Sequence, residues 1–191
     1  MSAGDASAAV KAKALLAAVK LGDVAEAEKL LDSGTPIESA DKNAWTALVW
    51  ACRGGNIAMA RMLLDRGADI EARGSGGWTP LSWAVRSGSE AVTALLLDRG
   101  ADLEAKDTGG WTALLWAAMR GHADVAELLL RRGAALADED GEDADVEALC
   151  HYPECLLVLR DADRIQRWHR RRLLALWWHR ISQPHGPKGG S

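Results

Sequence analysis

The chain has 191 residues, a formal net charge of −4, 48% hydrophobic residues and 26% charged residues. This length suits one domain, or one domain with a tail, and the composition is typical of a globular protein. Wholesale disorder, a collagen-like fibre and a disulfide scaffold are therefore excluded. The aromatic residues are unusual, because the chain has nine Trp, one Tyr and no Phe. An ordinary core would also use Phe, so the tryptophans need a specific explanation.

The ends of the chain bear on its location. The N-terminal residues lack the charged start and apolar stretch of a signal peptide, and the apolar run at 173–178 is far shorter than the roughly 20 residues of a membrane-spanning helix. Three cysteines without a secretory signal favour a reducing compartment and free thiols. We therefore expect an intracellular protein, in the cytoplasm first, with the nucleus left open.

The first helical pattern covers 8–40, after a flexible N-terminus predicted at 1–7. Two stretches rich in Ala and Leu each precede a glycine, Gly22 and Gly34. Glycine ends helices readily because it adopts positive φ at little cost. The pattern predicts two helices that lack the Trp-Thr opening of the segments that follow.

A 33-residue repeat comes next and divides the chain at 41–73, 74–106 and 107–139. The sequence Trp45-Thr46-Ala47-Leu48-Val49-Trp50-Ala51 recurs from Trp78 and again from Trp111. Two sets of glycines keep the same step: Gly55, Gly88 and Gly121, and Gly67, Gly100 and Gly133. A fixed period of this length indicates a repeat architecture.

Each unit predicts a pair of helices and a hairpin. Thr46, Thr79 and Thr112 are good N-caps, because their hydroxyls can accept from free backbone N–H groups. A short helix, a glycine turn, a second helix with a leucine run and a crossing to the next unit then follow. Neither helix can bury its apolar face alone, so the units must stack as a solenoid.

These motifs resemble the ankyrin repeat family over residues 8–137. The matching Thr, Leu, Ala and Gly positions, Pro80, the Gly121-His122 step and the Gly-Ala-Asp ends of the units carry the resemblance. It implies an all-α, ankyrin-like helix-turn-helix/β-hairpin solenoid with 8–40 as an N-terminal capping repeat. The family histidine is replaced by Val49, Ser82 and Leu115. Apolar packing is expected to substitute at Val49 and Leu115, while Ser82 keeps one hydroxyl.

The C-terminal part has an uneven charge. Residues 138–154 carry a charge of −8, and residues 155–191 carry +6. We expect an acidic segment and degenerate C-terminal repeat at 140–162, with Pro153 in the first turn of its helix. A basic Trp/Arg-rich helix at 163–182 and a disordered end at 183–191 complete the chain. The sequence leaves three interpretations of the tail open: docking on the acidic block, binding to nucleic acid or an anionic membrane, or an unstructured extension.

The resemblance places the tryptophan before each capping threonine near the hairpin, on the concave surface. Trp45, Trp78 and Trp111 are therefore candidate anchors for a partner, because rigid aromatics are enriched at binding hot spots. The alternative is that these rings lie flat over the hairpins and pack against one another. Trp50, Trp83 and Trp116, inside the first helices, are assigned to the core or to packing between units.

A second candidate set lies at the end of the first helices and at the loop tips. It comprises Arg53, Arg86, Met119 and Arg120, with Lys42, Asn43, Ser75 and Thr108. Arginine beside tryptophan can make bidentate and cation–π contacts to an acidic, aromatic partner. The alternative is ordinary solvated charge. Arg66, Arg99 and Arg132 also recur at the repeat step and are predicted to form a solvated rim.

No catalytic motif is found, and no cofactor or small-molecule substrate is predicted. Cys150 and Cys155 lack the second pair of ligands that a zinc site needs, so no metal site is predicted either. The sequence predicts a non-catalytic protein–protein interaction module, a scaffold or adaptor that binds a protein partner on its concave face. The alternative function is association with nucleic acid or an anionic membrane through the basic tail at 164–180.

Overall fold

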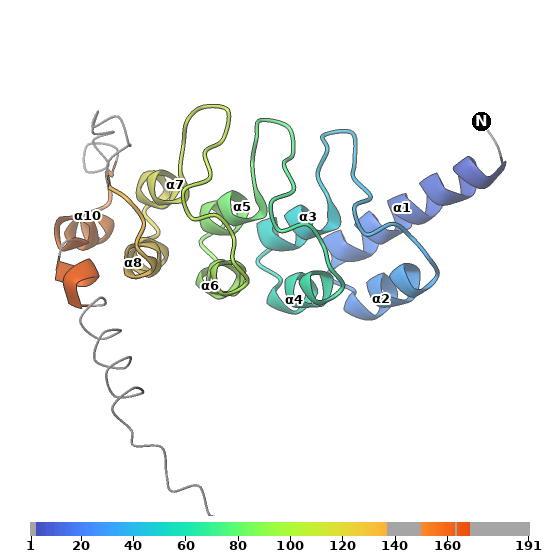
Figure 1. The fold of residues 1–191 in the computed structure, drawn as a ribbon, viewed down its shortest axis with the longest axis horizontal. Helices are drawn as coiled ribbons and strands as arrows, with labels where there is room; N and C mark the ends of the chain where they lie inside the picture. The colour runs from blue at the N-terminus through green and yellow to red at the C-terminus, as the bar shows by residue number, and fades with distance from the viewer. Residues whose placement is uncertain (1–2, 137–149, 163, 169–191) are drawn as a thin grey trace, which may run out of the picture.

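The structure is a computed structural model that describes residues 3–136, 150–162 and 164–168. Its helices lie in successive antiparallel pairs along one row (Figure 1). The helices are α1 (Ala3–Leu21), α2 (Val24–Asp32), α3 (Ala47–Arg53), α4 (Ile57–Asp65), α5 (Pro80–Arg86), α6 (Glu90–Asp98), α7 (Ala113–Arg120), α8 (Ala123–Arg132) and α10 (Pro153–Arg160). Within the described ranges there is no strand, only an isolated antiparallel bridge between Ala40 and Thr46.

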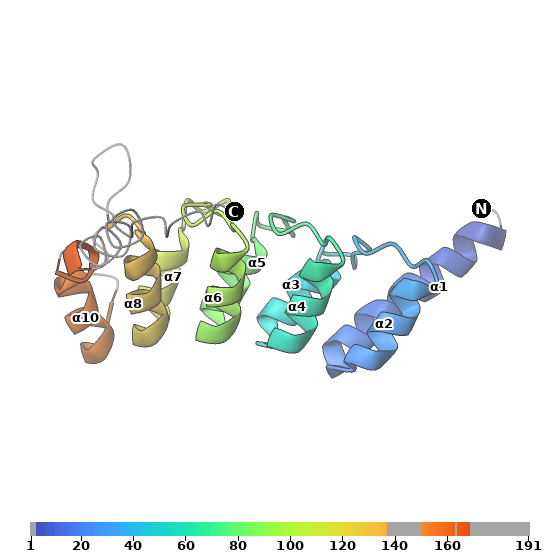
Figure 2. The same ribbon diagram turned by 60° about the horizontal axis from the view of Figure 1, so that its bottom comes forward.

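The helices form two layers. Helices α3, α5 and α7 pack on one another in one layer, and α4, α6 and α8 pack in the other. Long loops project from the first layer between successive pairs (Figure 1), and in the turned view α4, α6 and α8 lie in front of α3, α5 and α7 (Figure 2). The predicted all-α, ankyrin-like solenoid is therefore confirmed. In the described part of the chain, no helix has both the length and the apolar character to cross a membrane.

The predicted threonine caps and glycine turns are confirmed. The hydroxyl oxygen of Thr79 accepts from the N–H of Ser82 at 3.2 Å, and Thr46 and Thr112 cap their helices in the same way. The glycines that follow the helices adopt positive φ, for example 73° at Gly88 and 87° at Gly100. A left-handed backbone is cheap only for glycine, so the 33-residue step in glycine fixes where each helix ends.

The core runs through all helix pairs as one apolar cluster. Val49 and Leu115, which stand in place of the family histidine, are buried in it. Ser82 is buried as well, and its Oγ lies 3.1 Å from Oγ1 of Thr79. The sequence predicts this pattern, with apolar packing at Val49 and Leu115 and a retained hydroxyl hydrogen bond at Ser82.

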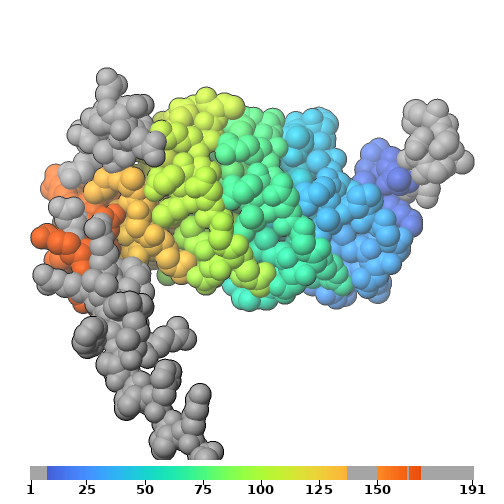
Figure 3. All heavy atoms as spheres, in the orientation of Figure 1, coloured from blue at the N-terminus to red at the C-terminus, as the bar shows by residue number. Residues whose placement is uncertain are grey.

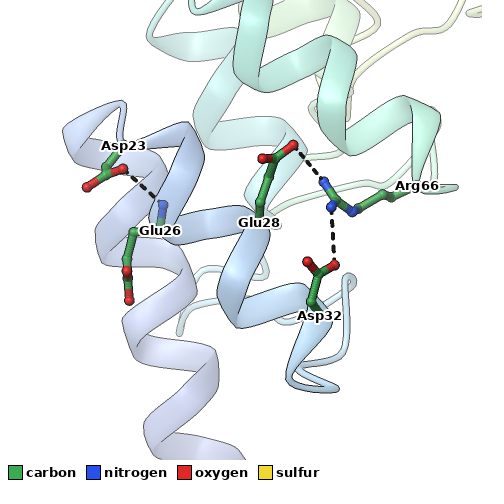
Figure 4. A network of polar contacts seen from close by, with 5 residues as sticks. All are labelled: Asp23, Glu26, Glu28, Asp32 and Arg66. Carbon is green, nitrogen blue, oxygen red and sulfur yellow. Dashed lines mark hydrogen bonds and ion pairs between the residues drawn. The ribbon is translucent and has the colours of Figure 1, made fainter.

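Polar contacts join each unit to the next on the side away from the first layer. The guanidinium of Arg66 on the loop after α4 pairs with Glu28 and Asp32 of α2, at 3.2 Å each (Figure 4). Arg99 pairs with Asp65 at 2.7 Å, and Arg132 pairs with Asp98 at 3.0 Å. The three arginines are exposed, in agreement with the predicted solvated rim, and the structure adds that they link neighbouring units.

A second ladder uses glutamates at the repeat step. The carboxylates of Glu38, Glu71 and Glu104 accept from backbone N–H groups of the next unit, at Asp69, Asp102 and Ala135, with distances of 2.8, 2.8 and 2.9 Å. Each bond satisfies a backbone donor where the chain leaves regular helix. Stacking therefore has a polar component, and the repeats form one continuous body in the space-filling view (Figure 3).

The ends differ from the prediction or lie outside the described residues. Helix α1 begins at Ala3, so helix replaces most of the flexible N-terminus predicted at 1–7, because the segment is rich in alanine, the best helix former. At the other end, 164–168 are helical and the N–H of Ile165 donates to the carbonyl of Asp161. The acidic residues 138–149, most of the predicted basic helix at 163–182 and the end at 183–191 lie outside the described residues.

Candidate protein-binding surface

Six tryptophan rings lie in one continuous row along the first helix layer. In spatial order the row is Trp50, Trp45, Trp83, Trp78, Trp116 and Trp111, and the centroids of successive rings are 4.9, 4.6, 5.0, 4.5 and 4.8 Å apart. These distances are typical of aromatic pairs that attract one another beyond simple burial. We call these six residues the tryptophan row.

The row combines two sets that sequence reasoning separated. Trp45, Trp78 and Trp111 precede the helix caps, whereas Trp83 and its two equivalents lie inside the first helices. Because Trp45 contacts Trp83 and Trp78 contacts Trp116, these two rings bridge to the next unit, whereas Trp111 contacts Trp116 of its own unit. The rings before the caps thus pack on rings inside the helices, and in the described part of the chain none of the three forms a ring pair with another member of its own set. Only Trp83 is buried, and the other five are half-buried. Trp50 and Trp116 both pack against the apolar core, and Trp116 also packs against Trp78 of the preceding unit, as their assignment to the core or to packing between units predicts.

Aspartates fix the two ends of the row. Oδ2 of Asp41 accepts from Nε1 of Trp50 at 3.2 Å, and Oδ2 of Asp107 accepts from Nε1 of Trp116 at 3.0 Å. The other carboxylate oxygen in each case accepts backbone N–H groups of the hairpin loop. One aspartate therefore holds both the loop and the ring of the first helix.

The middle unit lacks this aspartate. Gly74 occupies its position, and Nε1 of Trp83 is buried without a hydrogen-bond partner. A Cβ at position 74 would lie 2.6 Å from Cδ1 of Trp45, so the indole of the preceding unit fills the space of the missing side chain. The middle of the row is therefore held by ring packing instead of a carboxylate.

Three cations lie over the tryptophan row. The guanidinium carbon of Arg53 is 5.2, 5.0 and 5.5 Å from the ring centroids of Trp45, Trp50 and Trp83. The guanidinium carbon of Arg86 is 5.0, 5.1 and 5.6 Å from the ring centroids of Trp78, Trp83 and Trp116. Nζ of Lys20 lies 3.9 Å from the centroid of Trp50. All of these distances are within reach of cation–π attraction.

Arg120 extends this line of charge. Partial burial lowers the pKa of the Arg86 guanidinium from its ordinary value, and the positive charges of Arg120 and Arg53 lower it further. The arginines are therefore close enough to repel one another. We call Lys20, Arg53, Arg86 and Arg120 the cation row.

The cation row differs from the other repeated arginines in its partners. Arg66, Arg99 and Arg132 each pair with a carboxylate of the preceding unit. Within residues 3–136, 150–162 and 164–168, no member of the cation row has a carboxylate within ion-pair distance. The surface therefore combines flat aromatic rings with positive charge that the described residues leave uncompensated.

The remaining candidate residues flank this surface. Lys42, Asn43, Ser75 and Thr108 are exposed on the projecting loops. Three of them also join the loops: the N–H of Ser75 donates to the carbonyl of Asn43, and the N–H and hydroxyl of Thr108 donate to the carbonyl of Gly76. Met119 is 45% exposed at the end of α7.

Sequence reasoning missed Lys20. The signal was present, because a step of 33 residues back from Arg53 leads to Lys20, just as a step forward leads to Arg86. Residues 8–40 lack the Trp-Thr opening, so that motif does not group Lys20 with Arg53 and Arg86. The structure brings Lys20 beside Trp50 of the following unit.

Comparison with known protein families agrees with this architecture. A family model described as "Ankyrin repeats (3 copies)" matches residues 14–107 and 95–166. The chain therefore belongs to the ankyrin repeat family, as its sequence motifs predict. Ankyrin repeats generally mediate protein–protein interaction and are generally non-catalytic. No curated protein matches the chain.

Proposed function

We propose that the protein is a non-catalytic interaction module that binds an acidic polypeptide segment along the tryptophan and cation rows. The observation that carries this proposal is the contrast between two sets of repeated arginines. The set at the outer edge is paired with carboxylates, whereas the set above the tryptophans has no carboxylate partner among the residues that the structure describes. A partner that supplies carboxylates would complete the second set as the first set is completed within the chain.

The surface suits such a partner for two physical reasons. Stacking on tryptophan restricts the guanidinium groups of Arg53 and Arg86 before binding, so less side-chain freedom is lost when a carboxylate arrives. The half-exposed rings of Trp45, Trp78 and Trp111 offer apolar area for side chains between the acidic ones. Both interactions repeat with the spacing of the units.

The other candidate residues have supporting roles in this proposal. Arg120 and Met119 extend the surface at α7, with one charged and one apolar contact. Lys42, Asn43, Ser75 and Thr108 border it on the loops, where their exposed side chains can form hydrogen bonds with the partner backbone. The partner is expected to run across the units in an extended conformation.

The test uses a fluorescent 12-residue peptide of repeating Glu-Leu-Ser, acetylated and amidated, which spans roughly 40 Å when extended. We expect it to bind the full chain in a fluorescence anisotropy titration, and the matched Gln-Leu-Ser peptide to bind far less. Arg86→Gln should weaken binding about tenfold, because one charge-assisted hydrogen bond contributes roughly 1.5 kcal/mol. The matched control Arg99→Gln makes the same charge change at a paired arginine and should leave affinity nearly unchanged.

Two results would overturn the proposal. Equal loss of affinity in Arg86→Gln and Arg99→Gln would mean that only net charge matters. No binding of the acidic peptide, together with salt-sensitive binding of a single-stranded RNA or of phosphatidylserine vesicles, would favour the basic tail at 164–180 instead. Changing Arg170, Arg171 and Arg172 together to glutamine in the full chain would then abolish that binding.

A further inference from the structure

A cavity of about 610 Å³ lies where α1 meets α3, at the N-terminal end of the tryptophan row. Its lining brings two cations, Lys20 and Arg53, to the same indole, Trp50. Leu21 also lines it and is 84% exposed, so it adds accessible apolar area to the cavity. The cavity is open, positively charged and partly apolar.

We propose that this cavity binds an acidic side chain of the partner, with an aliphatic neighbour of that residue packed against Leu21 and Trp50. The proposal rests on the proposed function and adds to it the position of an anchoring contact. Lys20 and Arg53 together supply a compact ammonium and a planar guanidinium, which are suited to the two oxygens of one carboxylate.

The hydrogen-bond donors at the cavity favour a carboxylate over a phosphate group. The backbone N–H groups of Gly22, Gly54 and Asn56 all donate to carbonyls of their own helix pair. Many phosphate sites add free backbone N–H groups at helix ends or in glycine-rich loops to their cationic side chains, and this cavity offers none from these residues. Its available donors are on side chains.

The polar side chains of the lining offer mainly donors. Nε1 of Trp50 already donates to Asp41, so the indole contributes its ring face and edge. Oδ1 of Asn56 accepts from the N–H of Met59, which leaves its Nδ2 as the free end of the amide. A ligand that accepts hydrogen bonds is therefore complementary, whereas a cationic or donor-rich ligand is not.

The charge at the cavity can also be met by a partner. Among the residues that the structure describes, no carboxylate lies within ion-pair distance of Lys20 or Arg53, and none lines the cavity. An aliphatic neighbour on the partner would cover Leu21, which the described residues leave in solvent. A partner segment with one acidic residue followed by one aliphatic residue would pair with the two cations and cover Leu21.

The test is a titration of the full chain with the Glu-Leu-Ser peptide and with a Glu-Ser-Ser peptide. Lys20→Met should weaken binding of both peptides about tenfold. Leu21→Ser should weaken binding of the Glu-Leu-Ser peptide only, by roughly threefold, because it removes part of the apolar contact. The matched control Lys13→Met makes the same charge change on α1 outside the cavity and should have little effect. Circular dichroism checks that each variant keeps its helices.

The outcomes separate this inference from the proposed function. If Lys20→Met binds as tightly as Lys13→Met while Arg86→Gln is weakened, the cavity proposal fails and the proposed function stands. If wild-type protein binds neither acidic peptide, the proposed function fails and the cavity proposal falls with it.

In an ¹⁵N spectrum, the Trp50 indole resonance should shift on addition of peptide to wild type, and this shift should be lost in Lys20→Met.

Discussion

Asp107 offers the sharpest test of how the loops and the tryptophan row are held together. Its Oδ1 accepts from the backbone N–H groups of Gly109 and Trp111 at 2.8 and 3.0 Å, and its Oδ2 accepts from Nε1 of Trp116 at 3.0 Å. One carboxylate therefore fixes a loop, the ring before the cap and the ring inside the helix. We predict that Asp107→Ala destabilises the fold although Asp107 is not a core residue.

The magnitude follows from the burial of the three donors. The Gly109 N–H is exposed and regains water when the carboxylate is lost. The donors of Trp111 and Trp116 are partly buried, and bonds from such groups to a charged acceptor contribute about 1.5 kcal/mol each at the lower end of the usual range. Asp107→Ala should therefore lower the free energy of unfolding by about 3 kcal/mol. Asp107→Asn keeps one acceptor oxygen for the loop and should cost about half as much.

The assay is urea unfolding followed by far-UV circular dichroism. Asp69→Ala is the matched control, because Oδ1 of Asp69 accepts only the exposed N–H of Glu71. This control should cost less than about 1 kcal/mol. A double-mutant cycle of Asp107→Asn with Trp116→Phe should give a coupling of about 1 kcal/mol. Equal losses in Asp107→Ala and Asp69→Ala, or no coupling in the cycle, would refute the reasoning.

Three further predictions concern the middle of the repeat body. Gly74→Ala should destabilise by about 1–3 kcal/mol and alter the near-UV circular dichroism, because its Cβ would meet the packed ring of Trp45 at 2.6 Å; unchanged near-UV spectra would contradict this. Glu71→Ala should cost about 1 kcal/mol through the lost bond to the N–H of Asp102, whereas Glu71→Gln should recover most of it, as urea unfolding would measure. Burial raises the pKa of the Cys52 thiol above its ordinary value of 9.0, so the unfolded state loses this proton first as pH rises. Stability should then fall above pH 9 by at most about 1.4 kcal/mol per pH unit, and Cys52→Ala should show a shallower fall between pH 9 and 10.5.

Much of the fold could be predicted because its determinants are local. A threonine caps the helix that starts beside it, as Thr79 does, and a glycine such as Gly100 ends a helix through its own φ angle. Both effects act within a few residues, so they can be recognised in a linear sequence. Repetition made this local pattern easier to recognise, because it recurs at a fixed step.

The contacts between units could not be predicted in the same way. Whether the exposed Arg99 pairs with a carboxylate depends on Asp65, 34 residues away, and on how closely two units stack. The glutamate bond from Glu71 to the N–H of Asp102 likewise joins residues that only stacking brings together. Sequence patterns describe each unit well, but they carry little information on the distance between side chains of different units.

The sequence by itself determined the repeat, its helix boundaries, the family and the residue types available for binding. Only the tertiary structure decided how those residues combine. Tryptophans assigned to two separate roles form a single row, because Trp45 and Trp78 each reach the helix ring of the next unit. Lys20 joins the arginines because α1 stacks on α3. The nine tryptophans of the composition are thus partly explained: six form one surface, and its geometry depends on the stacking of the units.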